Sequence, residues 1–282
     1  MLKNILRTIA ARIPGAGDIK DIRSTLKEMQ EILGFLLNIE LENHPRYNDP
    51  KRLCRYGASV NSQNYEDGII QEIFRRIGVS DQVFVEIGVG DGLESNTAFL
   101  LSQGWTGFWI EANNRFLKTI QRYQLRDRVK YSVSFVTREN ITDIFSELGI
   151  PKEFDLLSID IDQNTFYIWE GLRRYRPRVV VVEYNAEIPP YIEWKAQYNP
   201  NRGWDGSKNF GASLMAFEKL ALELGYSLVG CDLTGVNAFF VRNDLVGDKF
   251  CEPFTAENHY EPPRYYLRRV YGFRRSILDR NR

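Results

Sequence analysis

The sequence has few of the features that mark disulfide-rich, zinc-binding or membrane proteins. Among its 282 residues there are only three cysteines and two histidines. Cys54, Cys231 and Cys251 are odd in number and have no paired spacing, which argues against a disulfide framework or a zinc site. No apolar run reaches the roughly 18 residues that a membrane-spanning helix needs, and the first residues lack the continuous apolar core of a signal peptide. We therefore expect a cytoplasmic protein.

The sequence also lacks an excess of charge of either sign. Lysine plus arginine and aspartate plus glutamate both number 37, so the net charge is zero and no overall field attracts nucleic acid. Charge is uneven locally, because residues 264–282 contain seven arginines and one acid, interleaved with aromatic residues. Such a tail is typical of a solvated segment, or of one that contacts acidic partners or an anionic membrane, and we do not favour nucleic-acid binding.

The length favours one large domain with appendages. Composition and turn signals divide the chain into an N-terminal helical extension, a polar linker, a main domain and a basic C-terminal segment. These parts cover residues 1–45, 46–61, 62–250 and 251–282.

The N-terminal extension contains two amphipathic patterns. Residues 2–13 place apolar side chains on one helical face, which predicts a helix that docks on protein or, alternatively, lies on the inner face of a membrane. Six further apolar residues alternate spacings of three and four, as in a heptad seam. The seam is short, so we expect either a homo-oligomer or packing on the domain's own surface. Its residues are Ile19, Ile22, Leu26, Met29, Leu33 and Leu36.

Short apolar runs alternate with helical patterns through most of the main domain. Repeated units of this kind predict a parallel sheet with right-handed crossovers, and two strands joined by a turn end the alternation. The predicted fold class is therefore α/β, with a Rossmann-like, mostly parallel sheet and helices on both faces. Ligands bind such sheets outside the carboxyl ends of the strands. The predicted strands are residues 83–87, 107–111, 129–136, 154–160, 178–184, 226–231 and 238–242.

A further helix is predicted just before the first strand, and Asn64 can cap it. Gly68 in its first turn disfavours a helix by about 1 kcal/mol relative to alanine. We therefore expect another part of the chain to approach the backbone at this glycine.

The most informative stretch is VFVEIGVGDGLESN, an apolar run that ends in a glycine-rich turn. Gly88 and Gly90 permit a sharp turn and the close approach of a ligand, and a helix from about Glu94 would point amide groups at that ligand. Glu111 ends the next strand, 25 positions after Glu86 and near the offset at which an acid binds ribose hydroxyls. The turn has no lysine and no GK[ST] follows, which excludes a P-loop. A cationic ligand with a ribose fits better, and an ordinary tight turn is the alternative.

Acidic residues follow two further strands. Asp160 and Asp162 end FDLLSIDIDQN, and Glu183 and Asn185 stand in the same relation in VVVVEYN. If these strands are neighbours, three carboxylates and an amide oxygen converge, and like charges this close repel unless a proton or a cation intervenes. All-oxygen ligands favour Mg²⁺, Mn²⁺ or Ca²⁺ over zinc. Alternatively, the acids cap helices or pair with arginines such as Arg178.

A long segment, residues 185–210, breaks the alternation with prolines and the polar run NRGWDGSKN. Connections of this length are usually functional loops. Its aromatic side chains could stack on a sugar ring or, alternatively, pack the loop onto the sheet. They are Tyr191, Trp194, Tyr198 and Trp204.

Several motifs, taken in order, resemble those of the FkbM-type methyltransferases, within the class I S-adenosylmethionine-dependent superfamily. They run from SQNYEDGIIQEIF through FVEIGVGDGLESNTAFLL, GWTGFWIEAN, LLSIDID and VVVVEYNAE to NAFFVR, and cover residues 62–242. The resemblance implies a seven-stranded sheet with a final antiparallel strand and S-adenosylmethionine as the cofactor. Gln163 departs from it, because the related pattern often has glycine there. The cofactor-binding residues expected on this basis are Glu86, Gly88, Gly90, Asp91, Asn96 and Glu111.

These features predict an O-methyltransferase that acts on a hydroxyl of a sugar, in a surface glycan or a glycosylated metabolite. Asp160, Asp162, Glu183 and Asn185 would hold Mg²⁺ or Mn²⁺, and the ion would lower the pKa of the acceptor hydroxyl. The alternatives are an N-methyltransferase without a metal and a non-catalytic scaffold with a vestigial cofactor pocket.

The catalytic base is the least determined part of this prediction. Asp160 and Asp162 are the expected catalytic acids of the site, and His259 is the candidate base because its ordinary pKa suits proton abstraction. Lys208 in the long loop and Asp162 itself are the rivals.

Overall fold

The computed structural model describes residues 16–201 and 203–267. The predictions for the helix at residues 2–13 and for the arginine-rich tail beyond residue 267 lie outside this part of the chain. Among the described residues, none of the helices combines the length and the hydropathy that a membrane span requires.

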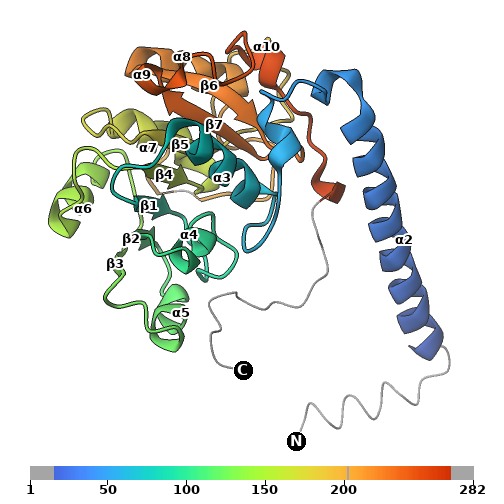
Figure 1. The fold of residues 1–282 in the computed structure, drawn as a ribbon. Coiled ribbons are helices and arrows are strands. Elements are labelled where there is room, and N and C mark those ends of the chain that lie inside the picture. The colour runs from blue at the N-terminus through green and yellow to red at the C-terminus, as the bar shows by residue number, and fades with distance from the viewer. Residues whose placement is uncertain (1–15, 202, 268–282) are drawn as a thin grey trace, which may run out of the picture.

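Seven strands form a single sheet in the order β3-β2-β1-β4-β5-β7-β6 (Figure 1). The first five strands pair in parallel, and β7 runs antiparallel to both of its neighbours, β5 and β6. This confirms the predicted α/β class and the antiparallel final strand. The strands are β1 (Val83–Ile87), β2 (Thr106–Glu111), β3 (Val129–Val133), β4 (Leu156–Ile159), β5 (Val179–Glu183), β6 (Tyr226–Cys231) and β7 (Asn237–Arg242).

Hydrophobic cores lie on both faces of the sheet. Val179 and Val181 of β5 pack into one core while Val180 and Val182 pack into the other, which is why this strand is apolar throughout. The first core is covered by α3 (Glu66–Ile77), α4 (Ala98–Ser102), α5 (Phe116–Arg122) and α9 (Asn243–Val246). The second is covered by α6 (Ile141–Leu148), α7 (Thr165–Gly171), α8 (Leu214–Leu224) and α10 (Ala256–His259), and a short turn of helix, η3 (Asp162–Asn164), precedes α7.

The start of α3 differs in part from the prediction. The N-cap is Tyr65, with a φ of 71°, and not Asn64, whose side chain instead donates to the carboxylate of Glu66. The expectation for Gly68 is confirmed, because a Cβ at this position would lie 2.1 Å from the carbonyl oxygen of Tyr56. The chain before α3 thus crosses directly over its first turn.

The segment predicted as a linker packs on the main domain. It follows α2 (Ala16–Asn43) and contains two turns of 3-10 helix, η1 (Pro45–Tyr47) and η2 (Leu53–Tyr56). Tyr47 and Leu53 are buried, and Leu53 belongs to the core beneath α3. The C-terminal segment runs from α10 to η4 (Tyr265–Leu267), and η4 lies against α2.

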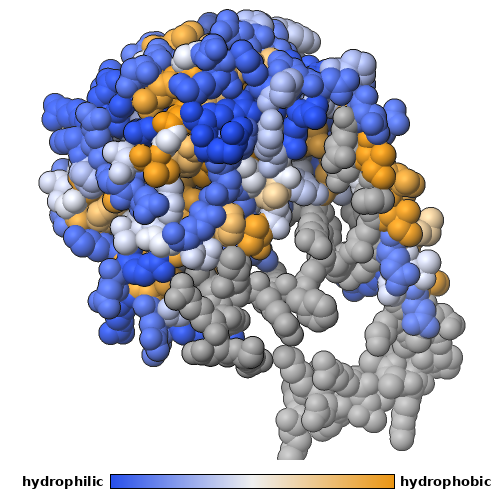
Figure 2. Space-filling model, viewed as in Figure 1, coloured by the Kyte–Doolittle hydropathy of each residue, from blue (hydrophilic) through white to orange (hydrophobic). Residues whose placement is uncertain are grey.

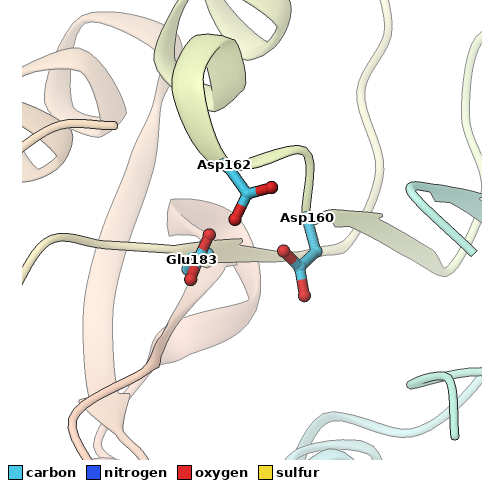
Figure 3. A group of neighbouring side chains, drawn as sticks. All are labelled: Asp160, Asp162 and Glu183. Atoms are coloured by element: carbon cyan, nitrogen blue, oxygen red, sulfur yellow. The ribbon is translucent and has the colours of Figure 1, made fainter. Parts of the chain in front are cut away.

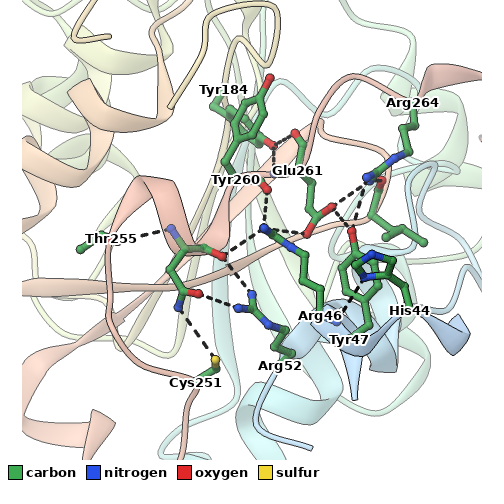
Figure 4. A network of polar contacts seen from close by, with 12 residues as sticks. His44, Arg46, Tyr47, Arg52, Tyr184, Cys251, Thr255, Tyr260, Glu261 and Arg264 are labelled. Carbon is green, nitrogen blue, oxygen red and sulfur yellow. Dashed lines mark hydrogen bonds and ion pairs between the residues drawn. The ribbon is translucent and has the colours of Figure 1, made fainter. Parts of the chain in front are cut away.

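Glu261 joins the N-terminal and C-terminal segments (Figure 4). Its carboxylate accepts hydrogen bonds from the Tyr47 hydroxyl at 2.7 Å and from Arg264 at 2.8 Å, and lies 3.4 Å from Arg46. Burial, together with the neighbouring charge of Glu261, raises the pKa of Tyr47 to about 12. The Tyr184 hydroxyl donates to the backbone carbonyl of Glu261 at 2.6 Å, which ties the network to the end of β5.

We expect Glu261→Gln to lower the free energy of unfolding by about 2 kcal/mol, because hydrogen bonds to a charged group are lost while Arg264 stays largely buried. Glu257→Gln, at an exposed position of α10, is the matched control and should change stability by less than about 0.5 kcal/mol. Urea unfolding of both variants measures the difference. Equal midpoints and slopes for the two would contradict the role assigned to Glu261.

Candidate active site

A cleft with a volume of about 310 Å³ opens at the carboxyl ends of β1, β2, β3 and β4. This is the edge at which sheets of this kind bind ligands. Gly88 and Gly90 line it from the turn after β1, Glu111 from the end of β2, and Asp160 and Asp162 from the end of β4. The structure therefore brings five of the predicted site residues into one cleft.

The glycine turn is held tightly between its neighbours. Gly88 has a φ of 89°, and its N–H donates to the carbonyl of Ile110 at 2.9 Å. A Cβ on Gly88 would lie 1.7 Å from the backbone carbonyl oxygen of Asp160, so only glycine lets β1 and β4 end this close together. The N–H of Gly90 donates to the carboxylate of Glu111 at 2.8 Å. The turn and this acid thus form one unit at the edge of the cleft.

Glu86 lies beneath the turn and does not line the cleft. Its buried carboxylate accepts a hydrogen bond from the backbone N–H of Asn96 at 2.9 Å and another from the Thr97 hydroxyl. That hydroxyl in turn accepts from the indole of Trp109 at 2.9 Å. Burial raises the pKa of Glu86 to about 7. Asn96 is also buried and donates to the Ser158 hydroxyl at 3.1 Å, so both predicted cofactor residues shape the cleft from behind.

The expectation of a helix from about Glu94 is wrong. The helix α4 begins later and has only five residues, so it does not point a row of amide groups at the cleft. The residues before it form a turn, in which the N–H of Gly92 donates to the carbonyl of Val89 at 3.0 Å and the N–H of Asn96 donates to the carboxylate of Glu86 at 2.9 Å. Asp91 is part of this turn, where its carboxylate accepts from the N–H of Leu93 at 3.0 Å, and it is not among the cleft residues.

Asp160, Asp162 and Glu183 converge at the adjacent ends of β4 and β5, as predicted. Each offers a carboxylate oxygen within 4.8 Å of the others, and Figure 3 shows the three side chains directed toward one another. Asp160 is open to the cleft, but protein surrounds it on the other sides. This burial, together with the charge of Asp162, raises the pKa of Asp160 to about 7. Burial and the charge of Asp160 raise the pKa of Glu183 well above its usual range. The three acids are therefore held close together despite their repulsion.

Nothing in the described part of the chain neutralises these acids by an ion pair. Arg178, which the sequence presented as an alternative partner, pairs with Asp155 at 3.2 Å instead. The Oε2 atom of Glu183 is buried and has no hydrogen-bond partner. Carboxylates in this arrangement need a shared proton or a cation, and an all-oxygen site suits Mg²⁺ or Mn²⁺. The residues present thus fit a divalent ion.

Asn185 follows β5 beside the acids, and its side-chain amide is hydrogen-bonded within the protein. Its side-chain N–H groups donate to the carbonyls of Lys208 at 2.9 Å and Phe210 at 3.0 Å, and its oxygen accepts from the N–H of Glu187 at 3.1 Å. Asn185 is thus a buried anchor that holds the long loop near the acids, and the role of its oxygen as a metal ligand stays a prediction. Sequence spacing could not show the bonds to Lys208 and Phe210, because these two residues lie more than twenty positions away.

The structure places His259 outside the cleft. It lies in α10, where burial and the charge of Arg52 lower its pKa to about 3, so the imidazole is neutral near pH 7. His259 is buried and is not among the residues that line the cleft, which does not fit the predicted role of base. The rival Lys208 forms an ion pair with Glu187 at 2.6 Å, which leaves Asp162 as the rival that lines the cleft.

Two contributions to the site were missed from the sequence. Residues 134–136, just after β3, form a wall of the cleft, and their position at a strand's carboxyl end could have shown this. Glu66 is buried at the start of α3, accepts from the side-chain amide of Asn237 at 2.6 Å, and adds to the raised pKa of Asp160. Asn237 is the partner of Glu183 in the β5–β7 register, so Glu66 lies behind the acids.

Neither a model of a known protein family nor a curated protein matches the chain. Similar solved structures include an O-methyltransferase family protein from Burkholderia thailandensis, with 9% identity, a TM-score of 0.39, and coverage of 63% of this chain and 58% of that one. Another is the 1,6-didemethyltoxoflavin-N1-methyltransferase of the same organism, with 12% identity, a TM-score of 0.41, and coverage of 62% and 76%. The O-methyltransferase NcsB1 from neocarzinostatin biosynthesis has 12% identity, a TM-score of 0.38, and coverage of 57% and 49%. The match spans little more than half of the first of these structures, and similarity of this degree identifies neither ligand nor reaction.

Proposed function

We propose that this protein is an S-adenosylmethionine-dependent methyltransferase that methylates a hydroxyl group. One observation carries the proposal. The same cleft contains the glycine turn with Glu111 and also Asp160 and Asp162, two members of the acid group Asp160, Asp162 and Glu183. A donor and an acceptor bound at these two places would lie next to each other, which is the main requirement of group transfer. The motif order that resembles FkbM-type methyltransferases supports the same reaction.

The glycine turn and Glu111 are suited to the donor. A carboxylate at the end of the second strand can accept hydrogen bonds from both ribose hydroxyls, and the glycines let the ligand approach the backbone. Ile110 and Val136 give the same part of the cleft an apolar surface, which suits an adenine ring.

The acid group is suited to the acceptor and to a divalent cation. Asp160, Asp162 and Glu183 would hold Mg²⁺ or Mn²⁺, and such an ion lowers the pKa of a bound hydroxyl and orients it. In the transfer, the hydroxyl oxygen forms a bond to the methyl carbon while the carbon–sulfur bond breaks and its electron pair stays on sulfur. The hydroxyl proton passes to a carboxylate of the cleft or to water.

A sugar is the acceptor that the loop supports best. Tyr191 and Trp204 are 69% and 54% exposed, and Gly203, the residue before Trp204 in the chain, lines the cleft. Tyr198 instead packs against Tyr167, with ring centroids 4.9 Å apart, and serves the loop itself. The exposed aromatic rings of the loop can offer an apolar face, and the carboxylates of the cleft offer hydrogen-bond acceptors, which together suit a sugar ring.

Calorimetry and mass spectrometry test the proposal in sequence. We expect the full chain to bind S-adenosylmethionine in the micromolar range, and a glycan pool incubated with enzyme, donor and Mg²⁺ to gain the mass of one methyl substitution on a hydroxyl. No donor binding at high micromolar concentration would favour a non-catalytic scaffold. Methylation of an amine, unaffected by a chelator, would favour an N-methyltransferase.

A further inference from the structure

The helix α2 presents a long apolar face that the described chain does not cover. The heptad seam predicted from the sequence lies on this face, and its members are between 53% and 69% exposed. α2 meets the rest of the described residues mainly at η1 and η4, so the alternative that the seam packs on the domain's own surface does not fit this part of the chain. Figure 2 shows hydrophobic residues gathered along the helix.

We propose that this face binds α2 of a second copy of the chain, side by side and in parallel. The helix has 28 residues, which is four heptads and a length of about 42 Å. Apolar residues spaced alternately three and four apart match the repeat that joins two helices. In a two-fold interface the same surface of each copy contacts the other copy. An apolar face that repeats along the helix meets this requirement.

The residues beside the seam favour the parallel orientation. They change along the helix from polar, as at Arg23 and Thr25, to apolar, as at Ile32, Leu37 and Ile39. In a parallel pair, Ile32 of one copy faces Leu37 of the other, so apolar residues meet each other. In an antiparallel pair the charged end of one helix would lie against the apolar end of the other, which leaves Arg23 desolvated without a partner.

The groove beside the seam is shaped for a second helix. Leu26, Met29, Leu33 and Leu37 line it together with Tyr266 of η4, and it has a volume of about 650 Å³. Gly34 also lines the groove, and the carbonyl oxygen of Tyr266 lies 3.8 Å from the position of its Cβ, so η4 forms one wall of the groove at this glycine.

Charge argues against a membrane as the occupant of this face. Membrane-surface helices carry lysine and arginine on their polar side, which attract anionic lipids. The residues of α2 include six acids, at 18, 21, 28, 31, 40 and 42, against three bases, at 20, 23 and 27. A helix with this excess of acid is repelled by an anionic surface, whereas a second copy has no such cost along an apolar seam.

Light scattering on the full chain tests the proposal directly. We expect the parent protein to have twice the 32.9 kDa mass of one chain, and Leu26→Glu to have the mass of a single chain. Ser24→Glu places the same residue on the opposite face of the helix and should keep the doubled mass. Circular dichroism and donor binding should be unchanged in both variants, since glutamate favours helix and α2 lies outside the cleft.

Cysteine cross-linking tests the orientation. Under oxidation, Leu26→Cys and Leu36→Cys should each give a doubled band on a non-reducing gel, because a parallel pair sets each residue against its own copy, while Ser24→Cys should not. If neither Leu26→Cys nor Leu36→Cys forms a cross-link, the parallel pairing is overturned. A single-chain mass for the parent, or a doubled mass that Leu26→Glu leaves unchanged, overturns the interface. Binding of the single chain to anionic vesicles would assign the face to a membrane instead.

Discussion

Asp162→Asn is expected to lose methyl transfer by on the order of 100-fold or more while still binding S-adenosylmethionine. The residue lines the cleft, and its carboxylate lies within 4.8 Å of those of Asp160 and Glu183. Removing one of three charges weakens any divalent ion held there and leaves the acceptor hydroxyl without its orientation. Donor binding should persist because the donor is assigned to the glycine turn and Glu111. Calorimetry and a steady-state assay on the same preparation separate the two effects.

The choice of asparagine matters because Asp162 has a φ of 56°. Asparagine tolerates this left-handed conformation better than alanine does, so a loss of activity in Asp162→Asn reports the missing charge rather than a strained backbone. Asp162→Ala should be at least as impaired, with a further cost in stability. Asp143→Asn, at an exposed acid of α6, is the control and should keep full activity. Full activity of Asp162→Asn, or of the parent in excess chelator, would remove the metal from the proposal.

The second large effect is expected for Gly88→Ala. The added Cβ would lie 1.7 Å from the carbonyl oxygen of Asp160, so the ends of β1 and β4 would have to separate. That movement would break the hydrogen bond from the Asp160 N–H to Ile87, now 2.9 Å long, and widen the cleft. We expect a loss of about 3 kcal/mol or more in the free energy of unfolding and a loss of donor binding in the molecules that remain folded.

Gly149→Ala separates the collision from the backbone conformation. Gly149, at the end of α6, has a left-handed backbone with a φ of 70° and a ψ of 34°, but nothing lies within 4 Å of its Cβ position. This variant should lose only about 1 kcal/mol, the ordinary cost of alanine in that region, and should bind the donor normally. Urea unfolding and calorimetry on both variants measure the difference. Similar losses in the two would show that the contact between Gly88 and Asp160 is not what constrains the cleft.

The fold could be predicted because its signals are local and repeated. The run Val179–Val182 is apolar at every position, which indicates a strand covered on both faces, and both faces are covered. The convergence of Asp160, Asp162 and Glu183 followed from the same logic, since carboxyl ends of neighbouring parallel strands share one edge of the sheet. Periodicity and strand direction were sufficient for these conclusions.

The failures concern side chains whose partners are distant in sequence. Asn185 has the residue type of a ligand, and the sequence could not show that its amide nitrogen donates to carbonyls at positions 208 and 210 and so anchors the long loop. His259 has the residue type of a base, but the fold buries it beside Arg52 and lowers its pKa to about 3. Glu86 was expected to shape the cofactor turn, and it lies beneath that turn with its carboxylate bound to the N–H of Asn96, so its direct contact with a cofactor stays a prediction.

The sequence by itself determined the order of the strands along the chain, the glycine turn, the acids at the strand ends and the seam of α2, because each depends on residue type at a fixed local spacing. Only the tertiary structure decided which of these residues face the cleft and which form hydrogen bonds that hold loops and turns. It also decided which apolar face has no partner in the part of the chain that the structure describes. The physical reason is that hydrogen bonding and burial depend on what lies alongside a residue in space, and residues far apart in sequence supply most of those neighbours.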